Sequence, residues 1–334
     1  MDNTSKNPAK IAIVCGAACG GCDVAIVNLH ERLLDISDKI QIVFWHTATD
    51  FKIEDLEKIP KVDIGIYIGS IRNEEHIELA KKLREKSQFL VAFGSCACFG
   101  GLFSLGNVAS KSEILKTVYL ETPNTENPEE KFPGQKVLAD SIDITLPKLT
   151  DWCLPINSVV NVDIYVQGCP PIGDSIEKFY EALKNYLEKG VPPERGSVVP
   201  NVKTLCDICP REKPEKIVIR RFKRVHEGPI DDKLCFLAQG IICLGPITVA
   251  ACDAACIKAN MPCRGCLGSP PEILDRAAKF ISTIASLIEI DREKEIPDEE
   301  LMKIVQEIVD PLGTFHRFTF GSGIFNKKQE DVEE

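Results

Sequence analysis

Apolar runs that alternate with amphipathic segments constrain the fold of this chain more than any other feature. Between residues 9 and 190, strand-like runs such as "KIAIVC", "VDIGIYIGS" and "VDIYVQGC" alternate with segments of helical periodicity, of which "DSIEKFYEALKNYLEKG" is the last. Strands that are apolar along their whole length are typical of a parallel sheet covered on both faces. We therefore predict an α/β fold for residues 1–190, in the form of a flavodoxin-like, doubly wound parallel sheet.

The pattern changes after residue 190. Strand periodicity fades, and the clearest helical patterns are "PEILDRAAKFISTIASLIEI" and "PDEELMKIVQEIVD". Eight cysteines lie in the segment from Cys206 to Cys266. A segment with so little regular structure needs another source of order, which bound metal can supply. We therefore predict that residues 191–334 form a second, irregular and cysteine-rich domain.

The fifteen cysteines of this 334-residue chain indicate metal binding rather than disulfides. No apolar segment reaches the roughly 18 residues of a membrane span, and "MDNTSKNPAK" lacks the apolar core of a signal peptide. We therefore expect a cytoplasmic protein without direct membrane insertion, in a compartment that keeps thiols reduced. The net charge of −10 argues against a nucleic-acid partner, which would require a basic face.

Cysteines follow three of the strands predicted in the first domain. The first strand leads to Cys19 and Cys22, another ends in "GSCACFGG", and the last ends in "QGCPP" with Cys169. Because ligands of an open α/β sheet gather at the carboxyl ends of its strands, we expect these thiols to converge. Four thiolates suit a 4Fe–4S cluster, and the flanking glycines allow close approach of such a bulky group. Zinc also accepts four thiolates, but usually from two close pairs in a small knuckle, so we favour the cluster.

The cysteines of the second domain divide into two sets of four. Two Cys-x-x-Cys pairs with single thiols between them are a stronger signal for iron–sulfur clusters than one pair alone. The eight are Cys206, Cys209, Cys235, Cys243, Cys252, Cys256, Cys263 and Cys266.

The motifs "CGGC", "GSCACFGG" and "GCPP", in this order, resemble those of the small, electron-transferring subunit of nickel–iron hydrogenases, to which a subunit of complex I is related. The resemblance extends from residue 11 to the region of residue 270. It implies a proximal 4Fe–4S cluster on Cys19, Cys22, Cys96 and Cys169, facing a nickel–iron centre in a separate large (alpha) subunit. Cys98 is the alternative third ligand. We prefer Cys96 because the family pattern, Gly-Ser/Thr-Cys-Ala followed by Gly-Gly, places its cysteine there.

In the second domain, the resemblance implies a distal and a medial cluster. The distal cluster of many members uses a histidine ahead of the Cys-Pro-Arg motif, a place that Cys206 takes in "LCDICPR", so the implied ligands are Cys206, Cys209, Cys235 and Cys243. Many members have a 3Fe–4S medial cluster because a proline replaces one ligand. Here four thiols imply a 4Fe–4S medial cluster on Cys252, Cys256, Cys263 and Cys266. The remaining cysteines are expected to be structural: Cys15, Cys98 and Cys153.

One departure from the family pattern concerns proton transfer. Many periplasmic members carry a glutamate two residues after the second cysteine of the first motif. Val24 occupies that position here, and the acidic residue is Asp23. Asp23 is thus a candidate proton relay, although an acidic residue in the first turn of a helix is also an ordinary stabilising feature.

Within the family, the motifs look most like those of the gamma subunit of methyl-viologen-type, deazaflavin-non-reducing hydrogenases, and the sulfhydrogenase delta subunit is also similar. This likeness implies an oxidoreductase subunit with no catalytic centre of its own, found in methanogens and related anaerobes. It would relay electrons from hydrogen oxidation through three 4Fe–4S clusters to a ferredoxin-like delta subunit and heterodisulfide reductase. The alternatives are a relay subunit whose large partner lacks nickel–iron, and a zinc-stabilised binding protein. We expect the irregular residues 107–135 to contact a partner.

Overall fold

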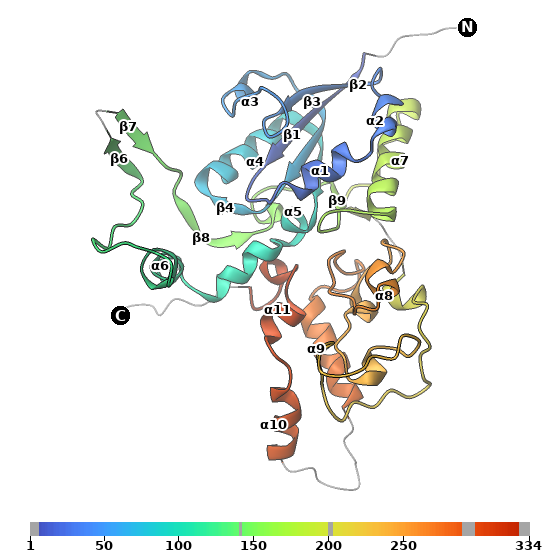
Figure 1. The fold of residues 1–334 in the computed structure, drawn as a ribbon. Coiled ribbons are helices and arrows are strands. Elements are labelled where there is room, and N and C mark those ends of the chain that lie inside the picture. Colours follow the sequence, from blue (N-terminus) through green and yellow to red (C-terminus); the bar gives the residue numbers. More distant parts are fainter. Residues whose placement is uncertain (1–6, 140–141, 200–202, 289–297, 327–334) are drawn as a thin grey trace.

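The computed structural model describes residues 7–139, 142–199, 203–288 and 298–326. Its centre is a six-stranded sheet in the order β10-β9-β5-β3-β1-β2, and every pair of neighbours is parallel (Figure 1). The strands are β1 (Ala9–Cys15), β2 (Ile40–Trp45), β3 (Val62–Ile68), β5 (Ser87–Phe93), β9 (Ile164–Val166) and β10 (Ser197–Val199). Strand β1 lies between β2 and β3, which is the strand order of flavodoxin-like sheets. The predicted fold class is therefore confirmed.

Alternating side chains of each strand enter two separate apolar cores. On β1, Ile11 and Ile13 belong to one core and Ala12 and Val14 to the other. The first core lies under α1 (Gly21–Val27), α2 (Glu31–Leu34) and α7 (Asp174–Lys189), and the second under α3 (Asp55–Lys58) and α4 (Glu74–Lys86). Because both faces are covered, the strands are apolar throughout, which is the pattern that the sequence presents.

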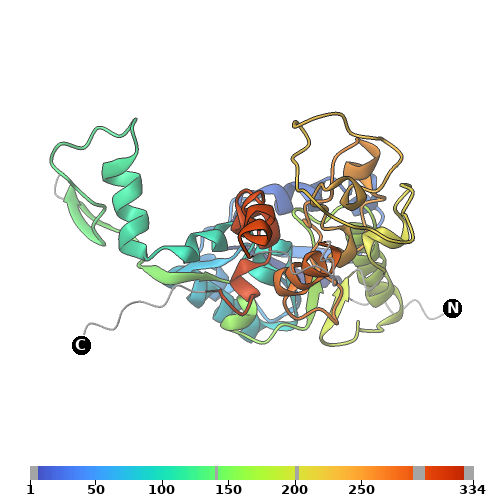
Figure 2. The same ribbon diagram turned by 90° about the horizontal axis from the view of Figure 1, so that it is seen from below.

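An arm leaves the α/β layer after β5. The chain continues through α5 (Ser95–Phe99) and the 3-10 segment η1 (Leu102–Val108), and then forms α6 (Lys111–Lys116) and the π-helical η2 (Thr117–Glu121). A hairpin of β6 (Lys136–Ala139) and β7 (Ile142–Thr145) follows, and β8 (Leu149–Leu154) returns to pair with β4 (Ile71–Asn73). We call residues 111–146 the arm; it extends away from the sheet in both views (Figures 1 and 2). The stretch expected to be irregular therefore contains helix and 3-10 structure.

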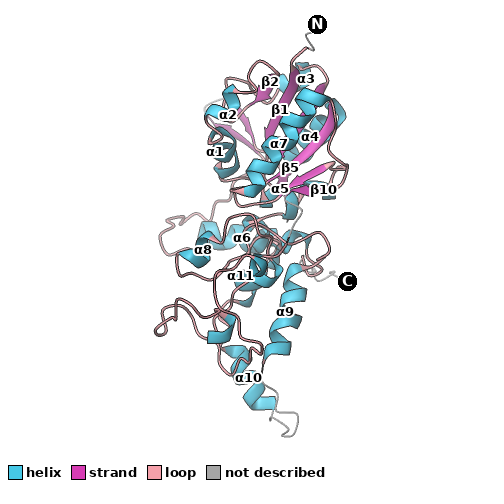
Figure 3. Ribbon diagram, turned by 90° about the vertical axis from the view of Figure 1, so that its right-hand side faces the viewer, coloured by secondary structure: helices cyan, strands magenta, loops and turns pink. Residues whose placement is uncertain are grey.

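The second half of the chain consists mostly of loops joined by short helices, as predicted, and lies beneath the sheet layer (Figure 3). Its elements are η4 (Leu205–Asp207), η5 (Leu237–Gln239), η6 (Gly245–Ile247), α8 (Ala255–Lys258), α9 (Arg276–Leu287), α10 (Asp298–Gln306), α11 (Pro311–Phe315) and η7 (Phe320–Ser322), whereas η3 (Ile156–Ser158) precedes β9 in the first half. The predicted helix from residue 271 begins only at α9, where the Asp275 side chain caps the Ala278 amide. Residues 289 and 290 of that pattern lie outside the described residues.

The two halves of the chain are not separated at residue 190. Strand β10 follows that position and completes the sheet beside β9. Near the other end of the chain, the Gly321 amide donates a 2.9 Å hydrogen bond to Ser104 Oγ, and Asn107 Nδ2 donates to the Asn326 carbonyl at 3.0 Å. The end of the described chain therefore packs on the first half. In the described residues, no helix combines the length and the apolarity needed to cross a membrane.

Candidate metal centres

Three turns at the carboxyl edge of the sheet carry the cysteines of the first half. Gly20 adopts a positive φ of 83° between β1 and α1, so the turn carries Cys19 and the first helical turn carries Cys22. Gly94 follows β5 with a φ of 89°, ahead of Cys96 on α5. Cys169 comes shortly after β9. The turns bring these four thiols to one edge of the sheet because parallel strands end on the same side.

Glycine is required where this edge is most crowded. A Cβ atom built on Gly94 would lie 2.4 Å from Cys22 Sγ, and one built on Gly101 would lie 2.4 Å from Cys96 Sγ. Carbon atoms in ordinary contact are about 3.5–4.0 Å apart. The backbone therefore approaches two of the four sulfur atoms so closely that no side chain fits.

The four thiols are close enough to raise one another's pKa values. Burial raises the pKa of Cys22, and the neighbouring Cys96, Cys169 and Cys19 raise it further. Burial, followed by Cys169 and Cys19, raises the pKa of Cys96 to about 12. Four such thiols cannot all ionise beside one another without compensating positive charge. Iron would supply that charge, since coordination deprotonates a thiol.

The three cysteines predicted to be structural make other contacts. Cys98 is buried in the second apolar core, where its Sγ donates to the Ala92 and Val166 carbonyls at 3.4 and 3.6 Å. Cys153 is also buried and donates to Ser70 Oγ at 3.2 Å. Cys15 is only half-buried at the end of β1, packed against the first core. Its pKa is raised to about 12 by burial and then by Asp23 and Cys19, so its thiol lies near the edge of this site.

A second set of thiols gathers around α8. Burial raises the pKa of Cys266 to about 12, and Cys263, Cys252 and Cys256 add to the rise. Cys263 is buried, and its Sγ accepts a hydrogen bond from the Gly265 amide at 3.4 Å. The structure thus places together the four cysteines predicted for the medial cluster.

The first and second sets adjoin. Ser95 Oγ, next to Cys96, donates a 2.9 Å hydrogen bond to the Cys266 carbonyl. The Cys169 thiol contributes to the raised pKa of Cys266. Beyond this contact, a Cβ atom on Gly268 would lie 2.6 Å from the Phe99 ring. The two halves of the chain are therefore packed tightly where the two sets meet.

The third set lines a small cavity of about 30 Å³. Its cysteines are those predicted for the distal cluster: Cys206, Cys209, Cys235 and Cys243. Burial, followed by Cys235 and Cys209, raises the pKa of Cys206 to about 12. Cys243 Sγ accepts a 3.3 Å hydrogen bond from the Cys263 amide, which joins this set to the second one. Four converging sulfur ligands around a cavity suit an iron–sulfur cluster.

Hydrogen bonds hold the Asp23 side chain against β2 and the turn that follows it. Its Oδ1 atom accepts hydrogen bonds from Trp45 Nε1 at 2.8 Å and from Thr47 Oγ1 at 2.7 Å. The Oδ2 atom is buried and has no hydrogen-bond partner among the described residues. His46 lies nearby; burial lowers its pKa, and Asp23 opposes that shift. The carboxylate is thus positioned beside the first set and retains one unused oxygen.

Two buried arginines beside the cysteine sets were missed in the sequence. Arg211, of the "CPR" motif, lines the third set's cavity with its guanidinium 3.8 Å from the centre of the Phe236 ring. Arg276 is 2% exposed and lies near Cys263 and Cys266. The sequence carried no signal for Arg276, because it lies inside the helix predicted from residue 271, and only the structure places it at the first residue of α9.

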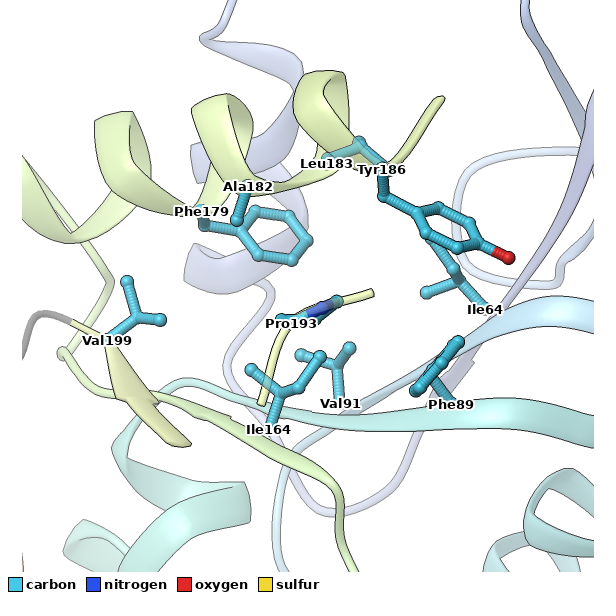
Figure 4. Close-up of a pocket in the computed structure, with 10 residues that line it drawn as sticks. All are labelled: Ile64, Phe89, Val91, Ile164, Phe179, Ala182, Leu183, Tyr186, Pro193 and Val199. Atoms are coloured by element: carbon cyan, nitrogen blue, oxygen red, sulfur yellow. The ribbon is translucent and has the colours of Figure 1, made fainter. Parts of the chain in front are cut away.

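We found no second candidate site among the other cavities and side-chain groups of the described residues. A small apolar cavity of about 30 Å³ lies between α7 and the sheet, lined by side chains such as Phe89, Phe179 and Pro193 (Figure 4). Its lining is aliphatic and aromatic apart from the Tyr186 hydroxyl. Within the described ranges, no three His, Cys, Asp or Glu side chains are grouped as they would be around a single metal ion.

Comparisons with known proteins identify relatives over nearly the whole chain. Residues 19–183 match the family described as NADH ubiquinone oxidoreductase, 20 Kd subunit. The chain is 36% identical over 328 residues to the iron-sulfur subunit of the F420-non-reducing hydrogenase of Archaeoglobus profundus, with 96% of this chain and 98% of the relative covered. It is 34% identical over 321 residues to the corresponding F420-non-reducing hydrogenase subunit of Methanothermobacter marburgensis, with 96% of each covered. The delta subunit of sulfhydrogenase 2 of Pyrococcus furiosus is 25% identical over 285 residues, with 85% of this chain and 92% of the relative covered.

Proposed function

Because the chain belongs to the family of these F420-non-reducing hydrogenase iron-sulfur subunits, we propose that it is the electron-transferring small subunit of a nickel–iron hydrogenase. The observation that carries the proposal is the succession of three sets of four thiols, from the sheet edge to the cavity of the third set. When bound, iron–sulfur clusters would supply one-electron chemistry, which thiols alone do not provide.

The first set would hold the proximal 4Fe–4S cluster through Cys19, Cys22, Cys96 and Cys169. The hydrogen bonds of Cys98 to core carbonyls support Cys96 as the third ligand, because the Cys98 thiol is directed into the core. The glycines that would collide with Cys22 and Cys96 support the same assignment, since they keep the backbone close to both sulfur atoms.

The large subunit, with its nickel–iron centre, would cover the face of α1 beside this set. Val24 and Val27 are 56% and 51% exposed there, although they lie on a helix otherwise packed on the sheet. Exposed apolar side chains that adjoin a functional site are typical of a permanent subunit interface. Asp23 lies on the same helix, and we propose that its unused oxygen relays protons to or from that partner.

The second and third sets would hold the medial and distal 4Fe–4S clusters. The medial ligands are proposed to be Cys252, Cys256, Cys263 and Cys266, and the distal ligands Cys206, Cys209, Cys235 and Cys243. This chain's part is to hold the clusters in succession, exclude water from them and donate hydrogen bonds to their sulfur atoms. The 3.3 Å bond from the Cys263 amide to Cys243 Sγ is one such contact.

Electrons would leave from the distal end to a ferredoxin-like delta subunit and heterodisulfide reductase in the cytoplasm. Ile208, between the two cysteines of "CDIC", is 43% exposed and offers an apolar contact for such an acceptor. The arm, with Leu138 and Ile142 70% and 66% exposed, is a second proposed contact with a partner subunit.

Anaerobic purification of the native complex tests this function. Three 4Fe–4S clusters predict about twelve irons and twelve acid-labile sulfides per chain, with nickel in the partner and hydrogen-dependent dye reduction. About eight irons would remove one of the three sets. Twelve irons without nickel or hydrogen uptake would instead identify a relay subunit whose partner has lost the nickel–iron centre. Bound zinc without iron would refute the proposal.

A further inference from the structure

Arg276 is one of the largest fully buried side chains of the described structure. It is the first residue of α9, immediately after the capping residue Asp275. The amides of a helix N-terminus carry partial positive charge, so this is an unfavourable place for a cation. Arginine stays protonated in proteins, so the buried guanidinium carries a positive charge at neutral pH. A buried charge of this kind is costly unless an anion compensates it.

The guanidinium lies against the loop that joins Cys263 and Cys266. Its Nη1 atom donates to the Gly265 carbonyl. A Cβ atom on Gly265, which has a φ of 82°, would lie 2.6 Å from Nη1 and 3.2 Å from Nη2. The loop therefore needs glycine at its middle position to accommodate the arginine between two cysteines.

Two nitrogen atoms of this guanidinium have no partner. Nε and Nη2 are buried and make no hydrogen bond within the described part of the chain. The acidic groups that face Arg276 are Cys263, Cys266 and Asp275, and the two thiols would become negative when a bound metal deprotonates them. Both carboxylate oxygens of Asp275 already accept backbone hydrogen bonds, from the Ala278 and Ile324 amides. Asp275 is therefore already engaged, and the sulfur atoms at the two cysteines are the acceptors left for Nε and Nη2.

The neighbouring Arg264 and the other buried arginine differ from Arg276. Arg264 belongs to the same "CRGC" loop but is exposed to solvent. Arg211 uses its Nη1 atom for the Asp231 and Leu234 carbonyls and its Nη2 atom for Asn260, and only its Nε lacks a partner. Arg276 thus combines deep burial with the larger unused donor capacity.

We propose that Arg276 donates hydrogen bonds to sulfur atoms of the cluster held by Cys263 and Cys266, and thereby raises the reduction potential of that cluster. This inference rests on the proposed function. One added electron makes the cluster more negative, so a fixed cation and N–H···S hydrogen bonds stabilise the reduced form more than the oxidised form. The fourth thiolate has the opposite effect, because it adds negative charge. Arg276 is therefore a positioning residue that keeps an all-cysteine medial cluster reducible.

The test is a redox titration of the purified complex, followed by electron paramagnetic resonance, with iron analysis of each variant. Arg276→Met removes both charge and donors, and Arg276→Lys keeps the charge but loses the planar set of donors. Arg264→Met is the control, because it removes an exposed charge from the same loop. We expect Arg276→Met to lower the one-electron reduction equilibrium constant of the medial cluster at least tenfold, which corresponds to about 59 mV. Arg276→Lys should shift it less, and Arg264→Met should leave it within twofold of wild type.

An Arg276→Met complex with full iron content and an unchanged medial potential would overturn the inference. An equal shift in Arg264→Met would overturn it too, since charge alone would then explain the effect. If Arg276→Met loses the medial cluster, the Arg276→Lys complex provides the test instead. The reduction potential of its medial cluster should then be lower than that of wild type, and an unchanged potential would refute the proposal. A wild-type complex that lacks a medial 4Fe–4S signal would refute the proposed function instead.

Discussion

Alanine at position 94 would place a methyl group in the space that the Cys22 sulfur atom occupies. The separation would be 2.4 Å, whereas ordinary contact begins at about 3.5 Å, so the sulfur must retreat by about 1 Å. Ligand distances in metal sites are held to about 0.2 Å, and a displacement of this size exceeds that tolerance several-fold. Gly94 also has a φ of 89° and a ψ of 161°, a glycine-only conformation in which alanine costs about 1–3 kcal/mol.

Gly20 is the matched control for this substitution. Its φ of 83° imposes strain of about 1–2 kcal/mol on alanine, but a Cβ atom there would meet nothing within 4 Å. Gly20→Ala should therefore lower stability without displacing a sulfur atom. Gly94→Ala should lose the proximal cluster, so that iron falls from about twelve to about eight per chain and hydrogen-dependent dye reduction stops.

Iron analysis and electron paramagnetic resonance of both purified complexes distinguish strain from ligand displacement. If Gly94→Ala has the same iron content as Gly20→Ala and keeps the proximal signal, the reasoning is refuted, because the loop would then have rearranged to make room for the methyl group. Loss of iron in both variants would show that backbone strain, rather than the position of Cys22, decides whether the cluster is held.

Three further substitutions test individual residues. Cys206→Ser should disturb the distal cluster's paramagnetic signal and spare the proximal one, whereas unchanged signals would show that Cys206 is not a ligand. Cys98→Ala should lower the free energy of unfolding by about 1–2 kcal/mol in chemical denaturation and leave the iron content unchanged, because the thiol is bonded to core carbonyls; loss of about four irons would identify Cys98 as the third proximal ligand. Asp23→Asn keeps an oxygen for Trp45 and Thr47 but removes the carboxylate, so hydrogen uptake should fall at least about tenfold at constant iron content if Asp23 relays protons. Uptake equal to that of wild type would leave Asp23 with only a structural role.

The sequence alone determined the sheet and the edge at which its cysteines gather. Strands buried on both faces must be apolar throughout, so their pattern is visible without knowledge of their neighbours. Parallel strands end on one side of a sheet, and cysteines that follow several such strands must therefore meet. These relations depend on local periodicity and chain direction, which explains why the fold class and a meeting of cysteines from three strand ends could be predicted, whereas the preference for Cys96 over Cys98 came from the family resemblance.

Only the tertiary structure decided how neighbouring residues are used. Cys96 and Cys98 lie on the same short helix, and packing alone directs Cys98 into the core. Strand β10 lies beyond the predicted boundary at residue 190 and joins the sheet through pairing with β9, which is distant in sequence. Arg276 reads as an ordinary helix residue in the sequence. It is buried against the Gly265 loop, whose carbonyl accepts a hydrogen bond from Nη1, and this contact joins two segments that no local pattern connects.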